Sequence, residues 1–128
     1  MADLNPIVPP VIDTQDDTTP TTPAWAEKII AVHNSVASGF VSHAVRIRAN
    51  HYFCWQEDDD HDFLAGNVHD EQAMSGYTDF FTKYEFDPWA AQLEAAFDAE
   101  GIAWQRTGVT YEPDTGFFHW SWDWEVAY

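Results

Sequence analysis

The sequence predicts an α+β fold in which two or three helices pack on a small antiparallel sheet of about three strands. Residues 117–126 alternate between large apolar and polar side chains with a period of two, which is typical of a strand with one buried face. Residues 87–100 carry apolar side chains at helical spacing between a start and a stop signal. A turn motif before residue 117 joins the last strand to the one before it, so the sheet is expected to end in a hairpin.

The C-terminal strand is the element on which the rest of the chain is expected to pack. One of its faces consists of Phe118, Trp120, Trp122, Trp124 and Val126. Each large aromatic residue can bury roughly 150–250 Å². At about 25 cal/mol per Å², this face could contribute on the order of 15–20 kcal/mol of gross burial. The opposite face is mostly polar and is expected to contact solvent or a partner.

The chain is expected to form one domain preceded by a tail. Residues 1–22 contain several prolines among threonines and acids, a composition that predicts a disordered segment. The single acidic domain is predicted over 23–128. Thr22 is the expected N-cap of its first helix, and Pro23 is the expected first helical residue. Apolar residues at spacings of three and four carry that helix to about residue 40.

The middle of the chain allows two interpretations. Residues 44–56 can alternate as a strand or continue the preceding helix, and we favour a helix that ends near residue 40 followed by a strand. Residues 70–83 could hold a short helix, because Met74, Tyr77 and Phe81 are in helical phase. A glycine within this second segment weakens the helical prediction.

The helix that follows has the clearest boundaries. Asp87 is the expected N-cap, Pro88 the first helical residue and Gly101 the residue that ends the helix after Glu100. A strand is predicted over 102–111. Proline and glycine in the next five residues then supply a turn.

The charge balance restricts the classes of partner. The chain has 22 acidic and 5 basic residues, for a net charge of −17. This charge disfavours direct binding to nucleic acid or to an anionic membrane and favours a basic partner. The single cysteine excludes an internal disulfide. Without a signal segment or a long apolar run, we expect a soluble cytoplasmic protein, and no motif predicts a cofactor.

Most acidic residues fall in the second half of the chain. Glu94 and Asp98 are four apart on a predicted helix, which separates them by roughly 6 Å. Asp123 and Glu125 are two apart on a strand, which separates them by roughly 6.5–7 Å. Both distances are comparable to the separation of phosphates in a nucleic-acid strand, where the rise alone is about 3.4 Å per charge. The candidate partner-binding residues are Glu57, Asp58, Asp59, Asp60, Asp62, Asp70, Glu71, Asp79, Glu94, Asp98, Asp123 and Glu125.

In size, composition and charge layout the chain resembles the DNA-mimic inhibitors, small acidic proteins that phages and mobile elements often encode. The resemblance covers mainly residues 57–128 and includes no shared motif, so it assigns no role to an individual residue. It implies a non-enzymatic inhibitor that occupies the basic nucleic-acid-binding surface of a host protein. Anti-CRISPR and anti-restriction activities are of this kind, and a phage-encoded inhibitor would act in the host cytoplasm.

Two other functional classes remain open. The chain could be an interaction module that binds through its aromatic face or through Arg46 and Arg48, and such a face could also pair two copies of the chain. It could instead be a small metal-dependent enzyme centred on His61 and His69. Because their spacing fits no known zinc motif, we predict neither a metal site nor a catalytic residue.

Overall fold

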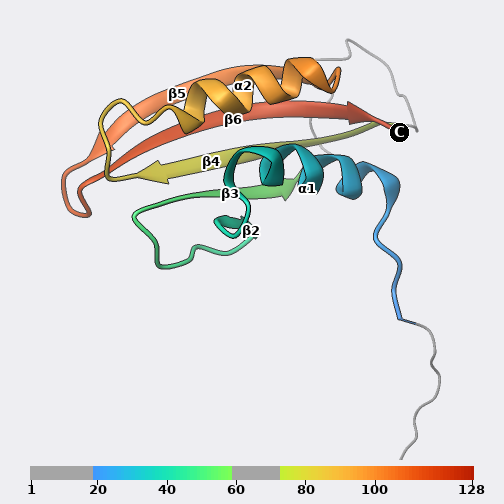
Figure 1. The fold of residues 1–128 in the computed structure, drawn as a ribbon, viewed down its shortest axis with the longest axis horizontal. Helices are drawn as coiled ribbons and strands as arrows, with labels where there is room; N and C mark the ends of the chain where they lie inside the picture. The colour runs from blue at the N-terminus through green and yellow to red at the C-terminus, as the bar shows by residue number, and fades with distance from the viewer. Residues whose placement is uncertain (1–18, 59–72) are drawn as a thin grey trace, which may run out of the picture.

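The computed structural model describes residues 19–58 and 73–128, which form an α+β unit with two helices and a five-stranded mixed sheet (Figure 1). The elements follow in the order α1 (Ala24–Ala37), β2 (Val41–His43), β3 (His51–Glu57), β4 (Ala73–Thr82), α2 (Trp89–Ala99), β5 (Ala103–Glu112) and β6 (Phe117–Ala127). The strands lie side by side in the order β2-β3-β4-β6-β5. The sheet is therefore larger than the predicted three strands, although the α+β class is confirmed.

The sheet is mixed because β2 runs parallel to β3 while every other pair is antiparallel. The predicted C-terminal hairpin is present as β5 and β6, and β6 also pairs with β4 in the middle of the sheet. Both helices lie across one face of the sheet (Figure 1). The opposite face of the sheet carries the alternate side chains of the strands, because successive side chains of a strand point to opposite faces.

The short helix predicted within residues 70–83 is wrong over the described part, where residues 73–82 form strand β4. Residues 70–72 lie outside the described residues. Thr78 and Phe80 point into the core, and Phe80 packs on Phe53 of the neighbouring strand with ring centroids 4.6 Å apart. The competing helical phase was a coincidence of three apolar positions, and cross-strand pairing on both sides of β4 outweighs it.

The strand predicted over 44–56 is also wrong at its beginning. The first helix ends at Ala37, a three-residue strand β2 follows, and residues 44–50 turn back before β3 starts at His51. The turn begins at Ala44, a non-glycine residue with a positive φ of 70°. The hydroxyl of Ser42 donates to the carbonyl of Val45 across the turn at 2.7 Å. Residues 44–50 thus form the short connection between the parallel strands β2 and β3.

The core lies between the helices and one face of the sheet. Trp122 and Trp124 of β6 are fully buried, as the alternation of the C-terminal strand predicted. Leu93 and Phe97 of α2 and Ile29 of α1 meet this sheet face and are fully buried as well. Burial of such side chains is the main stabilising term of the fold.

The helix boundaries test the predicted caps. Asp87 accepts a hydrogen bond from the backbone N–H of Trp89 at 3.0 Å, but the N-cap position is held by Pro88, which was predicted as the first helical residue, and α2 begins at Trp89. Gly101 has a φ of 70° and ends the helix, while the N–H of Ile102 donates to the carbonyl of Phe97 at 2.9 Å. Thr22 is not the N-cap of α1, because Pro23 holds that position without a side-chain cap.

A buried polar chain joins α1 to the centre of the sheet. The indole of Trp124 donates to the hydroxyl of Thr78 at 2.9 Å, and that hydroxyl contacts Nε2 of His33 at 2.8 Å. Nδ1 of His33 lies 2.7 Å from the carbonyl of Ile29 and must carry the proton that is donated there. Burial lowers the pKa of His33 to about 4, so the imidazole is neutral at physiological pH.

Candidate protein-binding surface

The sheet face opposite the helices gathers polar side chains from β4, β5 and β6, and we call it the polar face. Its described members are Ser75, Tyr77, Asp79, Glu112, His119, Ser121, Asp123 and Glu125. They alternate with the buried residues of the same strands, so the pattern that builds the core also builds this face. Three of the predicted partner-binding residues, Asp79, Asp123 and Glu125, are brought together here.

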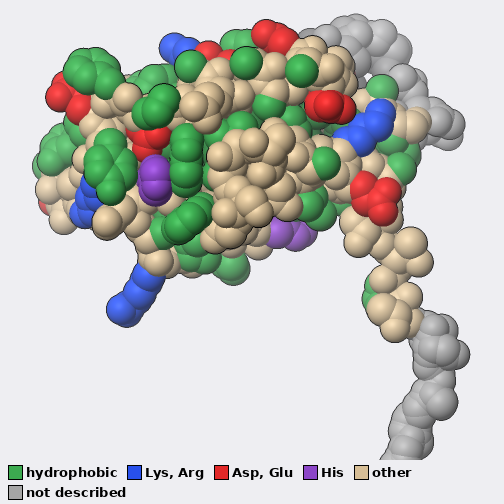
Figure 2. Space-filling model, viewed as in Figure 1, with side chains coloured by type: hydrophobic (Ala, Val, Ile, Leu, Met, Phe, Trp, Pro, Cys, Tyr) green, Lys and Arg blue, Asp and Glu red, His purple; other side chains and the backbone are tan. Residues whose placement is uncertain are grey.

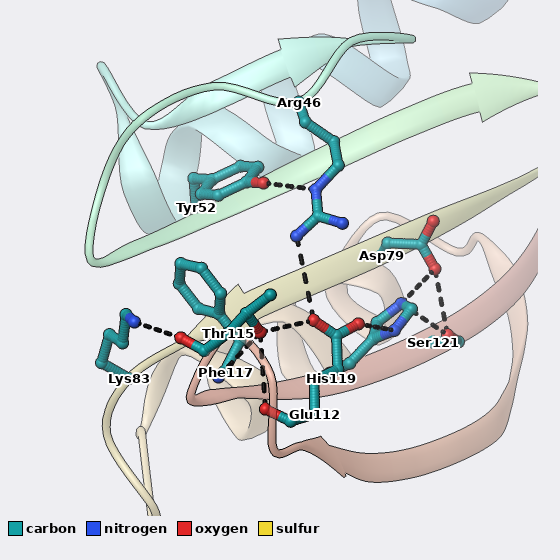
Figure 3. Close-up of polar contacts among 9 residues, drawn as sticks. All are labelled: Arg46, Tyr52, Asp79, Lys83, Glu112, Thr115, Phe117, His119 and Ser121. Carbon is teal, nitrogen blue, oxygen red and sulfur yellow. Dashed lines mark hydrogen bonds and ion pairs between the residues drawn. The ribbon is translucent and has the colours of Figure 1, made fainter.

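One end of the polar face is a histidine held between two carboxylates (Figure 3). Nε2 of His119 lies 2.9 Å from Oδ1 of Asp79, and Nδ1 lies 3.3 Å from Oε2 of Glu112. The hydroxyl of Ser121 also donates to Oδ1 of Asp79 at 3.0 Å. The hydrogen bond from Asp79 is the main cause that raises the pKa of His119, and the charge of Glu112 adds to it.

This histidine is not arranged to activate a serine. In a Ser-His-Asp triad the serine and the carboxylate bind opposite nitrogens of the ring. Here Asp79 and Ser121 contact the same nitrogen of His119, and the shorter contact belongs to the carboxylate. The Nε2 nitrogen that donates to Asp79 cannot at the same time accept the hydroxyl proton of Ser121. The cluster therefore orients charge on the surface and does not prepare a nucleophile.

The turn that follows β2 covers the edge of this cluster. Arg46 donates from Nε to the hydroxyl of Tyr52 at 3.1 Å, and its guanidinium lies 3.9 Å from the centre of the Phe81 ring. Another guanidinium nitrogen is 3.9 Å from Glu112. Figure 3 shows the side chain reaching from the turn toward Glu112. Arg46 therefore neutralises part of the charge at this end and is not displayed as a free basic group.

The middle of the polar face is acidic around a partly exposed aromatic residue. Tyr77 of β4 stands directly opposite Asp123 of β6, and Glu125 follows two residues along that strand. Asp79 and Asp123 are diagonal neighbours across the two strands, and such neighbours are roughly 7–8 Å apart. Burial raises the pKa of Tyr77, and the negative charges of Asp79 and Asp58 raise it further. The charge of Asp58 therefore acts on this face as well.

Three other predicted residues lie elsewhere in the fold. Glu94 of α2 receives two hydrogen bonds from Arg106, at 2.7 and 2.8 Å, and one from the indole of Trp122. Asp98, also on α2, accepts from the indole of Trp104 at 2.8 Å. Both belong to the helix layer and not to the polar face. In Figure 2, which has the same view as Figure 1, the acidic side chains form separate small patches.

Glu57, the third of these residues, occupies the end of β3, where its carboxylate contacts His43 of β2 at 2.7 Å. The hydrogen bond from His43 is the main cause that lowers the pKa of Glu57. The other predicted positions lie outside the described residues: Asp59, Asp60, Asp62, Asp70 and Glu71, together with His61 and His69 of the alternative metal site.

Sequence reasoning did not single out two features of the surface. Tyr77 was assigned to a helix face and not to the acidic sheet. Phe86 and Tyr84 lie in the turn between β4 and α2, with 88% and 50% of their surface exposed. The motif Tyr-Glu-Phe just before the Asp-Pro helix start could have indicated an exposed turn. Exposed aromatic residues of this kind are common anchors in protein interfaces.

Within 19–58 and 73–128, no three His, Cys, Asp or Glu side chains are grouped so that they could hold a metal ion. In the same ranges, neither helix is long and apolar enough to span a membrane.

No model of a known protein family matches the chain, and no curated protein matches it either.

Proposed function

We propose that the protein is a non-enzymatic inhibitor that binds the basic, nucleic-acid-binding surface of a host protein. The polar face is the contact surface in this proposal, and its carboxylates take the place of phosphates. The observation that carries the proposal is the convergence of Asp79, Asp123 and Glu125 from two strands, with the charge of Asp58 acting on the same face. Anti-CRISPR and anti-restriction activities are examples of this mechanism.

The chemistry of the contacts supports this use of the face. Glu125 accepts a hydrogen bond from the hydroxyl of Ser75, and Asp79 accepts one from the hydroxyl of Ser121 in addition to its contact with His119. Serine donors hold a carboxylate in position without cancelling its charge. Such fixed charges steer the association with a basic partner and specify its register.

Tyr77 gives the face a site for shape recognition. Its hydroxyl donates to the side chain of Gln56 at 3.0 Å, which fixes the ring between the acidic residues. A partly buried tyrosine loses little conformational entropy on binding and is frequent among interface hot spots. The proposed partner therefore combines lysine or arginine side chains with an apolar contact to this ring.

The first prediction tests the polar face by removing two of its charges together with that of Asp58, whose backbone N–H donates to the carbonyl of Ser75. The variant Asp58→Asn, Asp123→Asn, Glu125→Gln should lose at least about tenfold in affinity, because each charge contributes to steering and pairing. The measurement is displacement of a fluorescent DNA duplex from purified host proteins. The panel comprises a restriction endonuclease, a CRISPR effector, a DNA glycosylase and a nucleoid protein. The wild-type chain should displace DNA from at least one of them, and less at high salt.

The matched control is Glu27→Gln, Glu100→Gln, Asp114→Asn, which changes the net charge equally at exposed positions outside the polar face. It should change the affinity less than about threefold if position matters beyond net charge. Melting temperatures establish that both variants fold. Equal losses in the two variants would show that only net charge is read. Failure of the wild type to displace DNA from any protein of the panel would contradict the proposal.

A further inference from the structure

A cavity of about 480 Å³ lies where α1 passes the outer edge of the sheet, away from the polar face. Its lining is mostly apolar and aromatic and also includes polar side chains. The lining includes the apolar Trp25, Ile30, Val41 and Trp55, the polar Asn34 and Glu57, and residues 20–23 that precede α1. Trp25 and Trp55 meet edge to face with ring centroids 6.3 Å apart. The cavity therefore has the character of a side-chain pocket that is mostly apolar with a few polar groups.

Strand β2 forms the edge of the sheet beside this cavity. The carbonyl of Phe40 accepts from Phe53, and the N–H of Ala44 donates to Trp55, so these even-numbered residues bond toward β3. In a strand the alternate residues then direct their backbone groups to the other side. Val41 and His43 therefore present N–H and C=O groups outward, and no described strand pairs with them.

Glu57 contributes an acidic side chain to the lining of the cavity. The Glu57 carboxylate accepts a hydrogen bond from His43, whose ring stacks on Trp55 with centroids 4.0 Å apart. The lowered pKa of Glu57 keeps the carboxylate ionised at neutral pH. Because β2 ends at His43, no β2 side chain stands beyond it next to Glu57. A cationic side chain from outside can therefore approach this carboxylate.

We propose that β2 and this cavity bind an extended peptide segment of a partner protein. The segment adds to the sheet as a strand beside β2, places one apolar side chain in the cavity and directs a neighbouring lysine or arginine toward Glu57. The unpaired backbone groups of Val41 and His43 specify an extended peptide, because a strand is the partner that satisfies them. This site goes beyond the proposed inhibitory function and uses a different surface.

The dimensions agree with this mode of binding. An added strand lies about 4.8 Å from β2, and its alternate side chains point to the helix side, where the cavity opens. Glu57 lies one strand further, roughly 10 Å from the added backbone, which is within reach of a long cationic side chain and its carboxylate partner. The net charge of −17 also favours a segment that contains basic residues.

The second prediction tests the site with a phage-displayed library of random decapeptides selected on the immobilised full chain. Enriched peptides should share an apolar residue with a lysine or arginine two positions away. Their affinity, measured by fluorescence polarisation, should fall at least about tenfold for Asn34→Trp, because Asn34 lines the cavity and a larger side chain there fills it. Ala31→Trp is the matched control, since Ala31 is an exposed α1 residue outside the cavity lining, and it should change affinity less than about threefold.

Backbone methylation distinguishes strand addition from simple pocket binding. N-methyl groups at alternate amides of an enriched peptide should weaken binding at the positions that face β2 and have little effect at the others. Glu57→Gln should weaken the lysine-containing peptides selectively. The proposal is overturned if no peptide is enriched, if Asn34→Trp binds as well as the wild type, or if methylation has the same effect at every amide. None of these results depends on the polar face.

Discussion

Single residues in this fold owe their chemistry to the layer in which they lie. His33 and His119 have the same side chain and opposite pKa shifts, because one is buried among apolar groups and the other stands between carboxylates. His33 stays neutral and completes a buried hydrogen-bond chain, whereas the contacts with Asp79 and Glu112 raise the pKa of His119. Neither role is visible in the residues next to them in the sequence.

The third prediction concerns the pH dependence that His33 causes. Its pKa is about 4 in the folded protein and 6.5 in the unfolded chain, so the unfolded state binds the proton first as pH falls. The stability that His33 contributes is therefore present above about pH 6.5 and is lost toward pH 4. Between pH 7 and pH 5 the loss should be about 2 kcal/mol.

Urea unfolding of the wild type and of His33→Gln at both pH values measures this contribution. The wild type should lose about 2 kcal/mol more than the variant, because the variant has no titrating group at this position. An NMR spectrum of the wild-type imidazole provides an independent check that does not require a stable variant. A protonated His33 at pH 5 would contradict the expected shift.

At the scale of elements, hydrophobic period and turn chemistry determined β5, β6 and α2, while β2 and β4 depended on contacts distant in sequence. The ends of α2 follow from Asp87 and Gly101, whose roles are local. Strand β4 forms because β3 and β6 pair with it on either side. A three-residue strand such as β2 carries too little pattern to be predicted from sequence alone.

The fourth prediction concerns the close packing of β4 against β6. A Cβ atom on Gly76 would overlap the ring of Trp124 and the backbone oxygen of Gln56. Gly76→Ala should therefore destabilise the fold by about 1–3 kcal/mol, because the fully buried tryptophan cannot move without disturbing the core. The change in the free energy of urea unfolding measures this cost.

Gly108→Ala is the matched control, since nothing lies within 4 Å of the Cβ atom it would add on β5. Its effect should stay within about 0.5 kcal/mol. If the two glycine variants were equally stable, the packing of Trp124 over β4 would have to be looser than described.

At the scale of the whole molecule, the net charge of −17 opposes the compact state by self-repulsion. Thirteen of the 22 acidic residues lie in the described ranges, where Arg106 forms an ion pair with Glu94 and Arg46 with Glu112. Hydrophobic burial between the sheet and the two helices must outweigh this repulsion. Pairing of two copies of the chain stays a prediction. Such pairing would have to overcome the repulsion between two chains that each carry a net charge of −17.

The fifth prediction follows from this repulsion. Screening by salt should raise the urea midpoint of unfolding when NaCl increases from about 0.02 M to about 0.5 M, since the Debye length falls with ionic strength. The triple variant of the polar face has a smaller net charge and should show a smaller rise. A midpoint that is insensitive to salt would mean that local ion pairs compensate for the excess of acids.

The sequence by itself determined the α+β class, the C-terminal hairpin, the buried tryptophan face, the boundaries of α2 and the excess of negative charge. These properties depend on residues within a few positions of one another, so a local pattern contains them. Only the tertiary structure decided that Asp79 joins Asp123 and Glu125 while Glu94 is neutralised by Arg106. The physical reason is that strand register and helix packing bring distant residues together, and no local pattern specifies that register.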